Sequence, residues 1–188
     1  MALWIVLGIV AVLLAYLVMI YNGLVRMRAL VREGFSGITV QLRRRADLIP
    51  NLVSTVQGYA THERETFDQI TAHRADATTA QGVDATAKAD AQMTGMIGKL
   101  FAVAEAYPEL QASENFQQLQ TELSNIETEL SSARRYYNAT VRDLNTSVQS
   151  FPNVLIAGPA GFREEPFYQD DLPSISAAPK VSFDSPAA

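Results

Sequence analysis

The sequence has no cysteine, which excludes disulfides and thiolate metal sites, and it has only two histidines, His62 and His73. These histidines are 11 positions apart in the chain. That is about 16 Å along a helix, so the two side chains cannot bind the same ion within one chain. The zinc-protease pattern of two histidines around a glutamate is also absent. We therefore predict no metal site and no cofactor, and expect His62 to belong to a surface cluster with Glu63 and Glu65.

The sequence also lacks the usual signatures of catalysis. It contains no G-x-S-x-G nucleophile motif and no glycine-rich phosphate loop. The carboxylates of residues 114–150 alternate with an apolar stripe and are expected on the exposed face of a helix, where no pocket supports acid–base chemistry. The sequence therefore predicts that the chain is not an enzyme, and it indicates no small-molecule substrate.

Charge is absent from Leu3 to Ile20. Extended to Ala2 and Tyr21, this run has 20 residues, and as a helix it is roughly 30 Å long, the thickness of the hydrocarbon core of a bilayer. A cleaved signal peptide is the alternative. However, the run follows Met1 without a basic region, exceeds the usual apolar length and ends without a small-residue cleavage site. We predict a membrane anchor over residues 1–22, called the anchor segment below.

Acidic residues are almost absent just after the anchor segment. Residues 22–46 carry six arginines and one glutamate, whereas residues 47–188 are strongly acidic. Positive charge next to a span marks its cytoplasmic side. The sequence therefore predicts a single-pass membrane protein, with the N-terminus outside and the remaining chain in the cytoplasm. Arg26, Arg28 and Arg32 are the arginines expected near lipid headgroups.

Proline is scarce before residue 152, where only Pro50 and Pro108 occur, and six prolines follow from there to residue 186. This change predicts a helical domain over residues 23–151 and a proline-rich tail over residues 152–188. We expect the tail to pack on the domain to about residue 168 through aromatic side chains, and to be flexible beyond it. These aromatic residues are Phe162, Phe167 and Tyr168.

Apolar residues recur at helical spacing in two long stretches, which favours an all-α fold. One stripe runs from Phe116 to Phe151 in steps of three and four. Another runs from Val31 to Ala60, keeps its phase through Pro50 and is continued by Phe67 and Ile70. We therefore predict one long helix with a kink at Pro50 rather than two helices. A further helix is expected over 85–107, after a loose stretch that begins at His73. The predicted fold is the transmembrane helix continuing into a long antiparallel three-helix bundle, with a four-helix bundle as the alternative.

The stretch from Tyr21 to Glu63, "YNGLVRMRALVREGFSGITVQLRRRADLIPNLVSTVQGYATHE", closely resembles the signature region of the LemA family. The later segments "AYPELQASENFQQLQTEL", "RRYYNATVRDLNTSVQSFP" and "GFREEPFY" are similar to it as well, whereas "IAGPAGF" departs from its usual apolar helical turn. The resemblance implies a bacterial membrane-anchored helical bundle without established enzymatic activity. It also implies association with membrane proteases of the HtpX type, and a membrane-organising role suggested by a magnetosome relative.

The basic run Arg43, Arg44 and Arg45 has four interpretations. Nucleic-acid binding is disfavoured because the rest of the domain is acidic and no aromatic stacking platform accompanies the run. The plainest interpretation is a solvated helix face. The third is pairing with acids on the last helix, such as Glu122, Glu127 and Glu129, or with acids of another subunit. Lipid contact is disfavoured because Arg44 would lie about 35 Å beyond Tyr21 on a straight helix.

Small residues form one face of the anchor segment and end in a polar side chain. Such faces allow membrane helices to approach closely, so we predict self-association there. The leading functional hypothesis is a non-catalytic membrane scaffold that binds the bilayer and copies of itself. The second is an adaptor or regulator of a membrane protease, and an uncharacterised enzyme is third. The residues of the predicted face are Gly8, Ala11, Ala15 and Asn22.

Overall fold

A computed structural model describes residues 1–60 and 64–169, apart from the side chains of residues 64, 65, 73 and 75–77. The described part is helical and contains no strand, which confirms the all-α prediction. The helices are α1 (Ala2–Gln57), α2 (Arg64–Thr79), α3 (Val83–Glu105), α4 (Pro108–Gln111), α5 (Glu114–Gln149) and α6 (Val154–Ala157).

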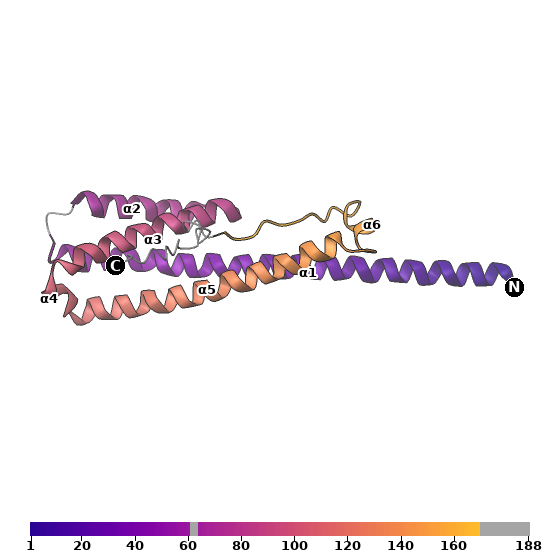
Figure 1. Ribbon diagram of the computed structural model, residues 1–188, viewed down its shortest axis with the longest axis horizontal. Helices are drawn as coiled ribbons and strands as arrows, with labels where there is room; N and C mark the ends of the chain where they lie inside the picture. Colours follow the sequence, from indigo (N-terminus) through magenta and orange to yellow (C-terminus); the bar gives the residue numbers. More distant parts are fainter. Residues whose placement is uncertain (61–63, 170–188) are drawn as a thin grey trace, which may run out of the picture.

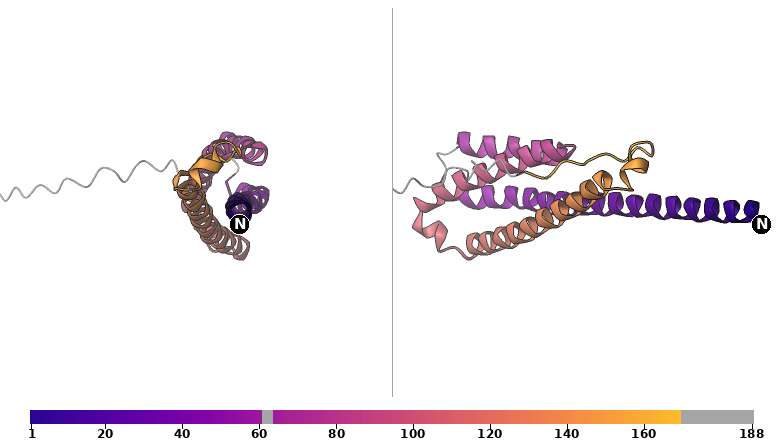
Figure 2. Two further views of the ribbon diagram at one scale, coloured as in Figure 1. Left: turned by 90° about the vertical axis from the view of Figure 1, so that its right-hand side faces the viewer. Right: turned by 45° about the vertical axis from the view of Figure 1, so that its right-hand side comes forward.

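The long helices form an elongated bundle in which α1 and α5 lie side by side (Figure 1). The shorter helices α2 and α3 pack as a pair at the end of α1 remote from the N-terminus, and the first part of α1 projects alone. Seen end-on in Figure 2, α2 and α5 lie on different sides of α1. At the end remote from the N-terminus the fold is therefore the predicted four-helix alternative, because α2 is a separate helix that packs with α1 and α3.

The prediction of a loose stretch from His73 was wrong, because α2 continues to Thr79 and α3 begins at Val83. The first helix also ends earlier than its apolar stripe suggested, at Gln57, and Phe67 and Ile70 belong to α2. Alanine is the best helix former, and the two buried side chains of α2 provide the packing that holds it. Phe67 and Ile70 fitted the apolar stripe of the first helix because α1 and α2 bury their apolar side chains in the same core.

Pro50 lies inside α1, and the helix continues through it without interruption. Proline has no N–H, so the carbonyl of Ala46 loses its usual donor four residues later. Arg74 of α2 supplies a replacement, because its Nε donates to the Ala46 oxygen at 2.8 Å. Pro50 thus leaves a carbonyl on α1 to which α2 binds through Arg74. The predicted kink of α1 at Pro50 stays a prediction.

Replacing Arg74 with alanine is expected to destabilise the bundle by about 1–3 kcal/mol, because the buried Ala46 carbonyl loses its partner. In a Pro50→Ala background the restored N–H satisfies that carbonyl, so the cost of Arg74→Ala is expected to be smaller. Denaturant unfolding of the four members of this mutant cycle measures the coupling. Equal costs in both backgrounds would show that Arg74 acts elsewhere.

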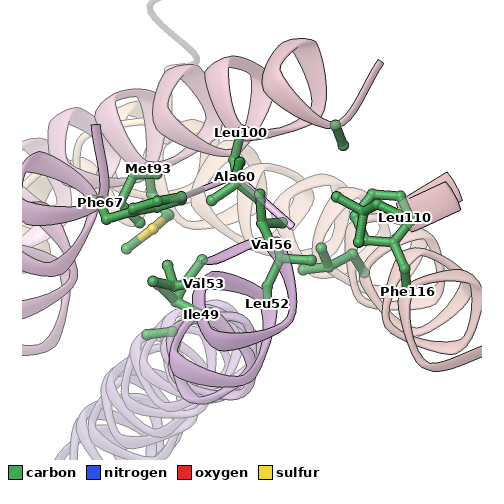
Figure 3. Close-up of a cluster of buried hydrophobic side chains, with 14 residues drawn as sticks. Ile49, Leu52, Val53, Val56, Ala60, Phe67, Met93, Leu100, Leu110 and Phe116 are labelled. Atoms are coloured by element: carbon green, nitrogen blue, oxygen red, sulfur yellow. The ribbon is translucent and has the colours of Figure 1, made fainter. Parts of the chain in front are cut away.

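Two hydrophobic cores lie along the bundle. The distal core joins α1, α2, α3, α4 and the start of α5 (Figure 3). The proximal core joins α1 and α5 to the residues after α5, through Leu24, Ile38, Val141, Phe162 and others. The side chains labelled in Figure 3 are Ile49, Leu52, Val53, Val56, Ala60, Phe67, Met93, Leu100, Leu110 and Phe116.

Helices α1 and α5 approach each other closely at Gly34, where a Cβ would lie 3.0 Å from the Cα of Tyr137. Gly34→Ala is therefore expected to cost about 1–3 kcal/mol, because backbone must move to admit the methyl group. Gly95→Ala is the control: it lies inside α3 with open space around it, and is expected to stabilise by about 0.5–1 kcal/mol. Thermal unfolding of both variants tests the contrast, and equal shifts in the same direction would contradict it.

Candidate functional site

The most concentrated polar site is a buried cluster around Asp90 of α3. Its carboxylate accepts hydrogen bonds from Arg45 of α1 and Arg134 of α5, and from the hydroxyl of Tyr168 at 2.8 Å. Asp90 lies in the apolar stripe of α3, three positions before Met93, and only 2 % of its surface is exposed. We call Arg45, Asp90, Glu127, Arg134 and Tyr168 the Asp90 cluster.

Arg45 is the central cation of this cluster and is as buried as Asp90. Its Nη2 also donates to the Asp90 backbone carbonyl at 3.1 Å, while its Nη1 donates to Glu127 at 3.1 Å and Thr94 at 3.2 Å. The two arginines and two carboxylates have equal and opposite charge, which a buried ionic group requires. The cluster thus joins three helices and the chain after α6.

The basic run divides into one buried and two exposed arginines. Arg43 and Arg44 are exposed; Arg44 donates to Gln41 at 3.3 Å and lines a hollow with Glu122 and Glu129. The sequence predicted Glu127 as a partner of the run but did not predict Asp90, because only acids of the last helix were considered as partners. The sequence did contain a signal for Asp90: this aspartate lies three positions before Met93, on the apolar side of the same helix, where a carboxylate needs a buried partner.

Residues 162–169, the return segment, run back along the bundle from α6 to the Asp90 cluster (Figure 1). Two asparagines of α5 hold its backbone by reciprocal pairs of hydrogen bonds. Asn145 exchanges bonds of 2.8 and 2.9 Å with Glu165, and Asn138 exchanges bonds of 2.8 and 3.1 Å with Tyr168. Phe162 and Tyr168 are buried, whereas Phe167 is exposed. The return segment therefore has a fixed path.

Tyr137 also holds the return segment, since its hydroxyl donates to the Pro166 carbonyl at 2.8 Å. Burial, followed by the charges of Glu165 and Asp84, raises the pKa of Tyr137 to about 12. The neutral form is thus favoured in the folded state, so this contribution to stability is present below pH 10 and is lost as the pH rises from about 10 to 12. Absorbance titration should show that Tyr137→Phe removes a tyrosine that ionises above pH 10; ionisation of Tyr137 near pH 10 would contradict the argument.

The anchor segment is the second candidate site. Ala2–Gln57 is the one helix of the described residues that is long and apolar enough to cross a membrane, and no residue of its most apolar window is buried. Gly8, Ala11, Ala15 and Asn22 are all exposed, and nothing lies within 4 Å of a Cβ built at Gly8. Protein atoms of the bundle therefore leave this surface open.

The arginines predicted near lipid do not share one environment. Arg26 and Arg32 are exposed on α1. Arg28 is half-buried: its Nη2 donates to the Gly161 carbonyl at 2.6 Å, and its guanidinium lies 4.1 Å from the centre of the Phe162 ring. Arg28 thus fastens the chain after α6 to the base of the anchor segment.

No group of three or more potential metal-ligating side chains occurs within the described residues. The proposed surface cluster of His62, Glu63 and Glu65, and the side chain of His73, lie outside them. The Asp90 carboxylate is occupied by its internal donors, so the cluster joins structural elements rather than presenting a reactive group.

A model of the LemA family matches residues 34–183. Magnetosome protein MamQ 2 of Paramagnetospirillum magneticum is 26 % identical over 201 residues, which covers 91 % of this chain and 74 % of that protein. MamQ of Magnetospirillum gryphiswaldense is 24 % identical over 190 residues, covering 85 % of this chain and 70 % of that protein. Protein LemA of Metamycoplasma hominis is 29 % identical over 132 residues, covering 69 % of this chain and 60 % of that protein. Since the family match includes most of the bundle and the whole Asp90 cluster, the chain belongs to the LemA family.

Proposed function

We propose that the protein is a non-catalytic, single-pass membrane scaffold that assembles with copies of itself. The observation that carries this proposal is the continuity of α1 from the exposed apolar anchor segment into the bundle. A continuous helix fixes the bundle at a set height and orientation on the bilayer, which is what a scaffold requires. The similarity to magnetosome proteins supports a role in organising a cellular structure.

The orientation is part of the proposal. Arginines outnumber acids just after the anchor segment, which favours a cytoplasmic bundle and an external N-terminus in the bacterial inner membrane. Proteolysis of right-side-out and inverted membrane vesicles tests it. The bundle should be cleaved only in the inverted vesicles, and cleavage in the right-side-out vesicles would reverse the orientation.

Self-assembly is proposed to use the small-residue face of the anchor segment, because Gly8 and Ala15 allow close helix approach and are not covered by any of the described residues. Replacing Gly8, Ala11 and Ala15 with isoleucine should convert an oligomer to smaller species. The control is isoleucine at Val6 and Leu13, which lie on the opposite side of the helix. Mass measurement in mild detergent checks the result, and a wild-type monomer would contradict the scaffold.

A second candidate is an adaptor for a membrane protease. It is favoured by a groove between α3 and α5 near the distal end, lined by Ile97, Phe101 and Leu123, that is large enough to receive a peptide segment. A monomer that gains mass only when the protease is added would support the adaptor. Arg43→Gln with Arg44→Gln tests whether the two exposed arginines of the basic run contribute to either interaction.

A further inference from the structure

The segment that follows α5 forms an apolar tip beside the base of the anchor segment. Residues 151–162, called the tip, contain the short helix α6 and lie next to the part of α1 where the anchor segment ends (Figure 1). The Phe162 ring lies 5.7 Å from the Tyr21 ring, and Leu24 is buried with Ala157 and Phe162. On a helix, Leu24 is about 4.5 Å beyond Tyr21. The tip is therefore level with the headgroup layer of a bilayer that surrounds the anchor segment.

The outer surface of the tip is apolar. Phe151 and Leu155 are 81 % and 66 % exposed, and Val154 is also exposed. No charged residue occurs between Asp143 and Arg163. Large exposed apolar side chains gathered within five positions mark a contact surface, because a solvated loop of this length normally carries charge.

The tip is also held in place. Gly161 and Phe162 are fastened to Arg28, and the return segment beyond them is bound to Asn145 and Asn138 of α5. The N–H of Phe162 donates to the Ala157 carbonyl at 2.8 Å, which closes the tip on itself. The exposed apolar side chains thus have a fixed height relative to the anchor segment.

We propose that the tip enters the headgroup layer of the bilayer and forms a second membrane contact beside the anchor segment. The proposal rests on the proposed membrane anchoring. Phospholipid is the occupant because the tip packs against Tyr21 and Leu24, where the anchor segment ends, and so lies beside the lipid that surrounds this segment. The backbone of the tip is irregular outside α6, which places it in the hydrated headgroup layer rather than in the hydrocarbon. Two contacts, one spanning and one interfacial, restrict tilt and rotation of α1 and so orient the bundle on the membrane surface.

Spin labelling of single cysteines in the full chain tests the proposal, because the natural sequence has no cysteine. The protein is placed in nanodiscs of phosphatidylcholine and phosphatidylglycerol, and labels are attached to Phe151→Cys and Leu155→Cys. Leu13→Cys reports the anchor segment, and the exposed distal position Gln120→Cys reports water. Relaxation by oxygen, which enters lipid, is compared with relaxation by a water-soluble nickel complex.

We expect the oxygen-to-nickel ratio at positions 151 and 155 to exceed that at position 120 several-fold, and to be below that at position 13. A water-like ratio at 151 and 155, with a lipid-like ratio at 13, would overturn the tip contact and leave the anchor intact. A water-like ratio at 13 would overturn both proposals. Tip labels that are immobilised and shielded from both reagents would show that protein covers the tip. That result would also overturn the proposed contact with lipid. Because both tip side chains are exposed, circular dichroism should show unchanged folding.

Discussion

Asp90→Asn is expected to destabilise the bundle by about 3–5 kcal/mol, because it leaves the buried Arg45 and the neighbouring Arg134 with one anionic partner instead of two. The substitution keeps the shape of the side chain, so cavity formation contributes little to the loss. The remaining carboxylate, Glu127, is half exposed and accepts from Arg45 at 3.1 Å. It therefore compensates only in part for the missing charge.

Denaturant unfolding of the full chain in nanodiscs, followed by circular dichroism, measures this loss. Asp68→Asn is the matched control, because it removes the same charge from an exposed position of α2 and is expected to change stability by less than about 0.5 kcal/mol. Since buried pairs are weakly screened, the Asp90→Asn loss should persist at high salt. A loss similar to that of Asp68→Asn would mean that the cluster does not hold the bundle together.

The second large effect is expected in the anchor segment. Val10→Arg with Leu13→Arg should prevent stable membrane insertion, because each arginine near the centre of a span costs roughly 2.5–3.5 kcal/mol on the insertion scale. Both positions are exposed, so the folded bundle should be unchanged. The variant is expected in the soluble fraction after alkaline extraction, whereas the wild type should remain with the membrane.

Gln120→Arg with Asn125→Arg is the control for this variant. It adds the same charge at exposed positions of α5, so the protein should stay in the membrane fraction. Alkaline extraction of both variants separates a local effect of charge in the span from a general effect of added charge. Retention of the Val10→Arg, Leu13→Arg protein in the membrane pellet would contradict anchoring by α1.

The sequence predicted the helical class, the continuity of α1 through Pro50 and the long last helix, because these follow from local periodicity. It missed α2 because an alanine- and threonine-rich stretch has few apolar residues to mark a stripe. It also missed Asp90 as the shared partner of Arg45 and Arg134, since the three residues belong to different helices. The sequence placed aromatic residues of the tail on the bundle without indicating which would be buried.

The sequence alone determined that a charge-free helix leads into a helical domain, because hydrophobic run length and helical periodicity are properties of neighbouring residues. Only the tertiary structure decided how the basic run is used, and which of its arginines is buried. It also decided that Arg74 satisfies the carbonyl released by Pro50 and that the tip lies level with Tyr21. These contacts join residues far apart in the chain, and their geometry depends on the packing of whole helices, which local sequence patterns do not specify.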